Sequence, residues 1–233
     1  MQEALPILLV PGLICSPRLY AGQIPELWRF GGVSVADHTR DDSMSGIARR
    51  LLSQAPPRFA LIGLSMGGYV AFEVLRQAPD RITKLALLDT TARPDIPEQT
   101  AQRLLQIEMA QSSRFGEIPD LLFPRFVAAS RHGDLPLRTT VRTMAEETGA
   151  EAFVRQQTAI MHRPDSGPGL HAIRCPTLVV VGDQDALTPP DRAAEIAAAV
   201  SHARQVVVPD CGHLSTLEQP DAVTRALIEF LGS

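Results

Sequence analysis

Six short runs of apolar residues recur along the chain, each nearly unbroken over four to six residues. A strand buried on both faces gives a continuous apolar run, whereas a half-buried strand alternates apolar and polar positions. Strands of the first kind occur in parallel sheets that helices cover on both sides. The pattern therefore predicts six parallel strands, at residues 5–10, 33–36, 59–64, 85–88, 177–181 and 205–208.

Segments of helical length follow most of these runs. Alternation of strands and helices is typical of an α/β fold, in which the crossovers between parallel strands are right-handed. The helices predicted for this core are residues 17–29, 43–53, 66–78, 189–200 and 221–231, the last with Gly232 as its stop.

The interval 93–170 contains no strand-like run. Its apolar residues recur at three- and four-residue spacing in 98–109 and 140–161, which predicts helices. We expect this interval to be a helical lid inserted into an α/β core formed by residues 1–92 and 171–233. The alternative is a helical embellishment without a role.

The composition is that of a globular protein, because 45% of the 233 residues are hydrophobic and 21% are charged. The length suits one domain, or one domain with an insertion. The net charge of −4 offers no basic surface to nucleic acid or anionic lipid. No apolar run reaches the roughly 18 residues of a membrane span, and residues 1–4 lack the positive charge of a secretory signal. We therefore expect a soluble, cytoplasmic protein; its oligomeric state stays open.

The three cysteines, Cys15, Cys175 and Cys211, are widely spaced. They match neither a disulfide framework nor a CxxC metal pair. Cys15 and Cys211 lie close in sequence to the candidate catalytic loops described below. We interpret both as packing residues rather than as redox-sensing thiols.

Residues 63–67 read Gly-Leu-Ser-Met-Gly, a G-x-S-x-G motif between a predicted strand and a predicted helix. In this context the turn holds the serine in a strained conformation that lifts its hydroxyl clear of the sheet, so the positions two before and two after it must be small. The N-terminal amides of the following helix favour negative charge at the same place. Ser65 is therefore the candidate nucleophile; the alternative is a glycine-rich turn with a bystander serine.

A serine hydroxyl needs a base to take its proton, and the pKa of histidine suits that task near neutral pH. His213 follows the last predicted strand, and loops at the carboxyl ends of parallel strands gather at the active sites of such sheets. Gly212 permits the close approach that the ring needs. We predict His213 as the base from six candidates, the others being His38, His132, His162, His171 and His202.

The histidine in turn needs an acceptor that fixes its tautomer and stabilises its protonated form. Asp185 lies in the middle of the loop after the fifth predicted strand, free to reach inward. Asp183 is its rival, and Asp89 and Asp210 are weaker candidates. Aspartates without this role would serve in turns or helix caps.

The resulting chain order, Ser–Asp–His, is that of α/β-hydrolases. The sequence resembles the small lidded branch of that superfamily over almost its whole length. This branch includes carboxylesterases, pimeloyl-carrier-protein methyl esterases, enol-lactonases, perhydrolases and C–C bond hydrolases. The resemblance rests on four landmarks: Val10-Pro11-Gly12, Gly63–Gly67, Gly182–Asp185, and Gly212-His213 followed by Glu218-Gln219-Pro220.

The resemblance implies an oxyanion hole built from two backbone amides, those of Met66 and Leu13. Many members have His-Gly where this chain has Pro11-Gly12. Members usually begin with an antiparallel pair of strands, for which the sequence before Leu5 leaves no room. We therefore expect an open sheet of six parallel strands in the order 2-1-3-4-5-6, with a ligand crevice where the order reverses between strands 1 and 3.

These features predict a serine hydrolase that cleaves a small carboxylic ester through an acyl-enzyme, with no metal or organic cofactor. The same three residues would serve a hydrolase of C–C bonds, lactones or thioesters, because only the pocket distinguishes these substrates. Arg125, Arg131 and Arg155 are candidates to bind a substrate carboxylate. A third hypothesis is a hydrolase-fold receptor that turns over little.

Overall fold

The computed structural model describes residues 4–233 and contains one sheet of six strands, all parallel. Three of the strands, β1, β3 and β5, are buried at every position, as their unbroken apolar runs predict. The predicted strand order is confirmed. It runs β2 (Val33–Val35), β1 (Ile7–Val10), β3 (Phe59–Leu64), β4 (Ile82–Leu88), β5 (Thr177–Gly182) and β6 (Ala203–Val208).

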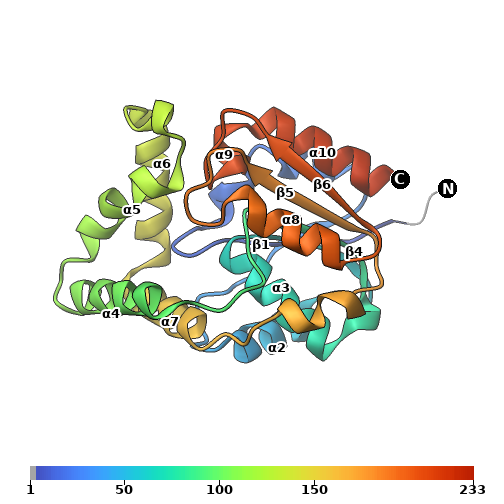
Figure 1. The fold of residues 1–233 in the computed structure, drawn as a ribbon, viewed down its shortest axis with the longest axis horizontal. Helices are drawn as coiled ribbons and strands as arrows, with labels where there is room; N and C mark the ends of the chain where they lie inside the picture. Colours follow the sequence, from blue (N-terminus) through green and yellow to red (C-terminus); the bar gives the residue numbers. More distant parts are fainter. Residues whose placement is uncertain (1–3) are drawn as a thin grey trace.

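Helices cover both faces of this sheet (Figure 1). The short α1 (Ile24–Leu27) packs against α10 (Pro220–Gly232), which lies above the sheet in the figure. On the other side lie α2 (Met44–Gln54), α3 (Met66–Gln77) and α8 (Pro190–Ala199). None of the helices in the described chain is long and apolar enough to cross a membrane.

Two details of the predicted helices are wrong. The expected helix 17–29 consists of a 3-10 turn, Pro17–Tyr20, and the single turn of α1. Gly22 lies between the two pieces, and glycine is a poor residue for a helix interior because its unfolded chain has more freedom to lose. Gly232 does not stop the last helix either, because α10 extends through it.

The segment 93–170, which we call the helical insertion, contains no strand and lies to one side of the sheet (Figure 1). A short helix there escaped prediction, because Pro119 and Pro124 look like helix breakers. Pro119 stands in its first turn, where the missing N–H costs nothing, and Pro124 stands near its end. The four α-helices are α4 (Pro97–Gln111), α5 (Ile118–Phe126), α6 (Leu135–Thr148) and α7 (Ala150–Met161).

Candidate active site

Ser65 occupies the sharp turn between β3 and α3 in a strained backbone conformation, with φ 56° and ψ −114°. A side chain at Gly63 would meet the Gly67 carbonyl oxygen at 2.3 Å, and one at Gly67 would meet the Val10 carbonyl oxygen at 2.0 Å. The positions two before and two after the serine must therefore be small, as expected, because backbone atoms fill the space that a side chain would need. The tight turn places Ser65 beside the loop that follows β1.

Replacing Gly67 with alanine is expected to lower the free energy of unfolding by about 2 kcal/mol or more, because the new methyl group would force β1 and α3 apart. Helix propensity alone predicts a more stable variant, since alanine is favoured over glycine within a helix by about 1 kcal/mol. Urea unfolding distinguishes the two. The matched control is Gly116→Ala, where no atom lies within 4 Å of the new side chain. Equal stability of the two variants would contradict the contact argument.

His213 lies in the loop after β6, and its Nε2 is 2.8 Å from Ser65 Oγ. The ring is 2% exposed and stacks on Phe126 at a centroid distance of 6.1 Å. The N–H groups of His213 and Leu214 both donate to the Phe126 carbonyl oxygen, each at 3.0 Å. The end of α5 in the helical insertion therefore fixes both the ring and the backbone of this histidine.

Asp185 holds the far side of the ring, with its Oδ2 at 2.8 Å from His213 Nδ1. The N–H groups of Leu187 and Thr188 donate to Oδ1, and the Thr188 hydroxyl donates to Oδ2. Burial opposes ionisation of the carboxyl, but His213 and these donors outweigh it and hold its pKa below the usual range. An ionised Asp185 accepts the Nδ1–H, which leaves Nε2 free to receive the Ser65 proton.

The rival aspartates lie in other interactions. Asp183 accepts the Cys211 N–H at 3.1 Å, and Asp210 is a turn residue with φ 51°. Asp89 is buried at the end of β4, where it accepts the Gly182 N–H at 3.0 Å and the Ser215 hydroxyl. Burial, together with the nearby Asp185 carboxylate, raises the pKa of Asp89 to about 8. The pKa of Asp89 is thus raised, whereas that of Asp185 is lowered.

The other five histidines do not reach Ser65. His38 is buried, and its Nε2–H donates to the Gly12 carbonyl oxygen at 3.0 Å. Burial lowers the pKa of His38, so it acts as a neutral donor that supports the loop after β1. The four others are exposed on the surface: His132, His162, His171 and His202.

The two predicted oxyanion donors, the N–H groups of Leu13 and Met66, donate to no acceptor within residues 4–233. Met66 is the first residue of α3, so its N–H has no partner inside the helix. The two chain segments lie together, since a side chain at Gly12 would come within 3.4 Å of Ser65 Cβ. Both amides are therefore available beside the serine.

Gln156 of α7 supports the same loop by accepting the Ile14 N–H at 3.0 Å, although it lies 142 residues away. Ile14 itself has φ 62°, a conformation rare for a β-branched residue. This contact holds the strained residue and joins the helical insertion to the loop after β1. No local sequence signal marks Gln156, because its partner is remote along the chain.

Glu218 is a second residue whose role the sequence did not reveal. Its carboxylate accepts the Gly212 N–H at 3.0 Å and the Ala128 N–H at 2.8 Å. Burial raises the pKa of the Glu218 carboxyl, although these donors lower it. Glu218 thus joins the residue before His213 to the helical insertion. We interpret it as a positioning residue for the histidine.

Glu218→Gln is expected to lower the free energy of unfolding by about 1–3 kcal/mol, because the new NH₂ group must face a backbone N–H. It should also lower kcat for an ester by about tenfold with little change in KM, since a shifted His213 loop misplaces the base. Urea unfolding and steady-state kinetics measure the two effects. The control is Glu229→Gln, an exposed residue that pairs with Arg204. A Glu218→Gln variant that matches this control would refute the positioning role.

A pocket of about 210 Å³ opens over Ser65 and His213, and most of its outer wall comes from the helical insertion. Leu13, Leu122 and Phe126 contribute apolar surface. Cys15 also lines the pocket, and burial raises the pKa of its thiol to about 12, which makes it a poor nucleophile. Cys211 is fully buried, with its pKa raised for the same reason.

Only one of the three candidate arginines, Arg125, lines this pocket. Arg131 pairs with Asp134, and Arg155 donates to the Thr39 carbonyl oxygen. Arg125 contacts the side-chain oxygen of Gln102 at 3.2 Å and pairs with no carboxylate among the described residues. The four other pocket arginines each have a carboxylate partner: Arg93, Arg103, Arg163 and Arg192.

Comparison with known proteins gives consistent results. A model of the alpha/beta hydrolase family matches residues 7–226. A thermophilic esterase from Thermogutta terrifontis, solved with malate bound, is 34% identical with a TM-score of 0.89, and the match covers 98% of this chain and 90% of that one. The enol-lactonase from Burkholderia xenovorans LB400 is 25% identical with a TM-score of 0.89, covering 99% and 92%. A pimeloyl-[acyl-carrier protein] methyl ester esterase from Edwardsiella ictaluri is 24% identical over 229 residues, which are 95% of this chain and 86% of that one.

Proposed function

This chain belongs to the alpha/beta hydrolase family, and from that premise we propose that it is a serine hydrolase that cleaves a small carboxylic ester through an acyl-enzyme. The observation that carries the proposal is a continuous hydrogen-bond network from Ser65 through His213 to Asp185. The distances from Ser65 Oγ to His213 Nε2 and from His213 Nδ1 to Asp185 Oδ2 are both 2.8 Å. Nucleophile, base and orienting carboxylate in that arrangement are what acyl transfer requires.

In the proposed reaction, Ser65 Oγ attacks the ester carbonyl while His213 Nε2 takes the hydroxyl proton. The N–H groups of Leu13 and Met66 donate to the oxyanion that forms, and loss of one such donor typically costs about 2.7–4 kcal/mol of barrier. His213 then gives its proton to the leaving alcohol. A water molecule, deprotonated by the same imidazole, attacks the acyl-enzyme and releases the acid and Ser65.

We also propose that the helical insertion, residues 93–170, acts as a lid that shapes the acyl pocket. In support, it contributes much of the pocket wall, including Leu122 and Phe126. It is also fastened to the His213 loop through Glu218. These links favour a lid whose α5 end stays attached to the histidine loop when other parts of it move.

Labelling with a fluorophosphonate tests the proposed nucleophile. The probe should add one adduct to the intact protein, and peptide mapping should place that adduct on Ser65. A panel of p-nitrophenyl esters of increasing acyl length then tests the substrate class. The pocket of about 210 Å³ favours short acyl groups over long ones. Absence of an adduct on Ser65 would refute the proposal.

A hydrolase of C–C bonds, lactones or thioesters is the second candidate, and Arg125 is the observation that favours testing it. Its guanidinium faces the pocket without a carboxylate partner in the described chain, and guanidinium groups bind carboxylates through paired hydrogen bonds. Lactones and dienoates that carry a free carboxylate belong in the same substrate panel. A receptor with little turnover would hydrolyse every substrate at rates far below the usual 1–10³ s⁻¹.

The pH profile should report the state of His213. Burial of the imidazole disfavours its charged form, but the Asp185 carboxylate outweighs burial and raises its pKa above the usual value. Only the neutral imidazole accepts the Ser65 proton, so kcat/KM is expected to be full above this pKa and to fall as the pH drops through it. Ester hydrolysis measured across the acid and neutral range checks this. Activity that increases toward acid pH would contradict it.

A further inference from the structure

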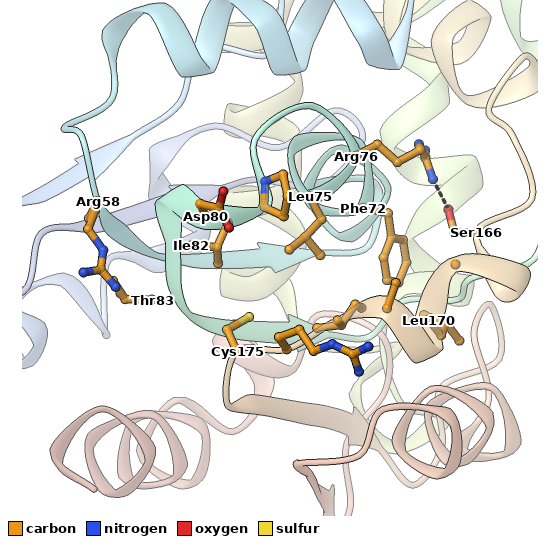
Figure 2. A pocket seen from close by; sticks show the side chains of 15 residues that line it. Arg58, Phe72, Leu75, Arg76, Asp80, Ile82, Thr83, Ser166, Leu170 and Cys175 are labelled. Carbon is orange, nitrogen blue, oxygen red and sulfur yellow. Dashed lines mark hydrogen bonds between the residues drawn. The ribbon is translucent and has the colours of Figure 1, made fainter.

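A second, larger cavity of about 790 Å³ (Figure 2) lies near the amino ends of β3 and β4. Ile82 and Thr83, the first residues of β4, line it, and so does Arg58, which precedes β3. Ser65 and His213, by contrast, follow the carboxyl ends of their strands. The two pockets share no lining residue. The volume falls within the roughly 300–1,000 Å³ range of small-molecule sites.

Part of the wall of this cavity is apolar. Phe72 and Leu75 come from the second half of α3, and Leu170 and Ile173 come from the segment that leads into β5. Figure 2 shows Phe72 and Leu75 on one side, with Leu170 and Cys175 across from them. A surface of this kind suits a hydrocarbon chain.

The rim of the cavity carries unpaired positive charge. Arg58 and Arg174 line it, and neither pairs with a carboxylate within residues 4–233. Arg76 also lines it but already pairs with Glu73, and Asp80 is the sole acidic lining residue. A ligand with a negative group would neutralise the excess positive charge.

Thr83 contributes to the same wall, although its hydroxyl oxygen does not. Its hydroxyl oxygen is buried and has no hydrogen-bond partner in the described residues, although buried polar groups usually have one. Figure 2 shows Thr83 and Arg58 together at one end of the cavity, with Phe72 and Leu170 toward the other. The Arg58 guanidinium at one end and apolar side chains at the other define a head and a tail.

We propose that this cavity binds an aliphatic carboxylate of medium chain length. The carboxylate lies at Arg58, and the hydrocarbon chain runs along Phe72, Leu75 and Leu170. Guanidinium groups bind carboxylates through charge-assisted hydrogen bonds. The apolar wall favours this ligand over inorganic phosphate or a short acid, because neither would cover it.

Cys175 provides a reporter inside the site. It lines the cavity and is partly exposed, whereas Cys15 and Cys211 are 2% and 0% exposed. Bound decanoate should slow N-ethylmaleimide labelling of Cys175 roughly tenfold at about ten times its dissociation constant, as measured by peptide mass spectrometry. Butyrate, inorganic phosphate and decyltrimethylammonium should leave the labelling rate unchanged. Equal protection by any of these three, or none by decanoate, would overturn the proposal.

Single substitutions test where the carboxylate of the ligand lies in the cavity. Arg58→Ala should weaken decanoate binding about tenfold in titration calorimetry, and the exposed Arg225→Ala on α10 should leave it unchanged. Arg58→Ala should keep the ester hydrolysis of the unmodified chain, because Arg58 lies outside the candidate active site. An unaltered dissociation constant in Arg58→Ala would refute the assigned head position. Neither labelling nor calorimetry requires turnover, so the outcome of these tests does not depend on whether the chain is a serine hydrolase.

Discussion

Replacement of Ser65 by alanine is expected to lower kcat for a p-nitrophenyl ester by about a million-fold, to near the background rate. The hydroxyl is the atom that would form the acyl-enzyme, and no other group of the pocket combines a nucleophilic oxygen with a hydrogen bond to His213 Nε2 among the described residues. Steady-state hydrolysis of the best ester in the panel measures the effect. The variant should also lose its fluorophosphonate adduct.

The fold should survive this change, because the Ser65 side chain makes a single hydrogen bond, to His213, among the described residues. Urea unfolding should therefore show a stability close to that of the unmodified chain. Ser53→Ala, an exposed serine at the end of α2, is the matched control and should keep full activity. Hydrolysis by Ser65→Ala above about 1% of the original rate would identify a different nucleophile and reject the proposed mechanism.

Asp185→Asn is expected to lower kcat by about 10⁴-fold with a smaller effect on KM. The neutral amide no longer stabilises the protonated imidazole, and it can favour the tautomer that places the proton on Nε2, where Ser65 must donate. Burial strengthens the effect, because the Asp185 side chain is 0% exposed and no water screens its pairing with His213. Steady-state kinetics on the same ester measure the loss.

Asp183→Asn is the control for this variant. Asp183 lies two residues away, is exposed and accepts one backbone N–H from Cys211. Its replacement should change kcat by only a few-fold. In Asp185→Asn the acid limb of the pH profile should also move to lower pH, because the carboxylate that raises the His213 pKa is gone. Equal rates for the two variants, or an unmoved limb, would show that another group orients His213.

The strands and the sharp turn at Ser65 were predictable because both depend on residues that are close together in the sequence. Apolar runs mark the strands, of which β1, β3 and β5 are buried at every position whereas the edge strands β2 and β6 are partly exposed. The G-x-S-x-G sequence marks a turn in which Gly63 and Gly67 touch backbone. The helical insertion was predictable as helix but not in detail. Two prolines concealed α5, which nevertheless carries the carbonyl group of Phe126 that holds the His213 loop.

The sequence alone determined the α/β architecture, the six strands, and a short set of candidates for nucleophile, base and acid, while the family resemblance supplied the strand order. Tertiary structure decided which candidates meet. Ser65 and His213 are 148 residues apart, and the hydrogen bonds of each carboxylate show that Asp185, rather than Asp183 or Asp89, contacts His213 Nδ1. It also assigned roles to His38, Gln156 and Glu218, whose partners are backbone groups in distant segments. Hydrogen bonds of this kind form only where two distant loops come together in space. Hydrophobic periodicity predicts the local helices and strands but not which loops meet.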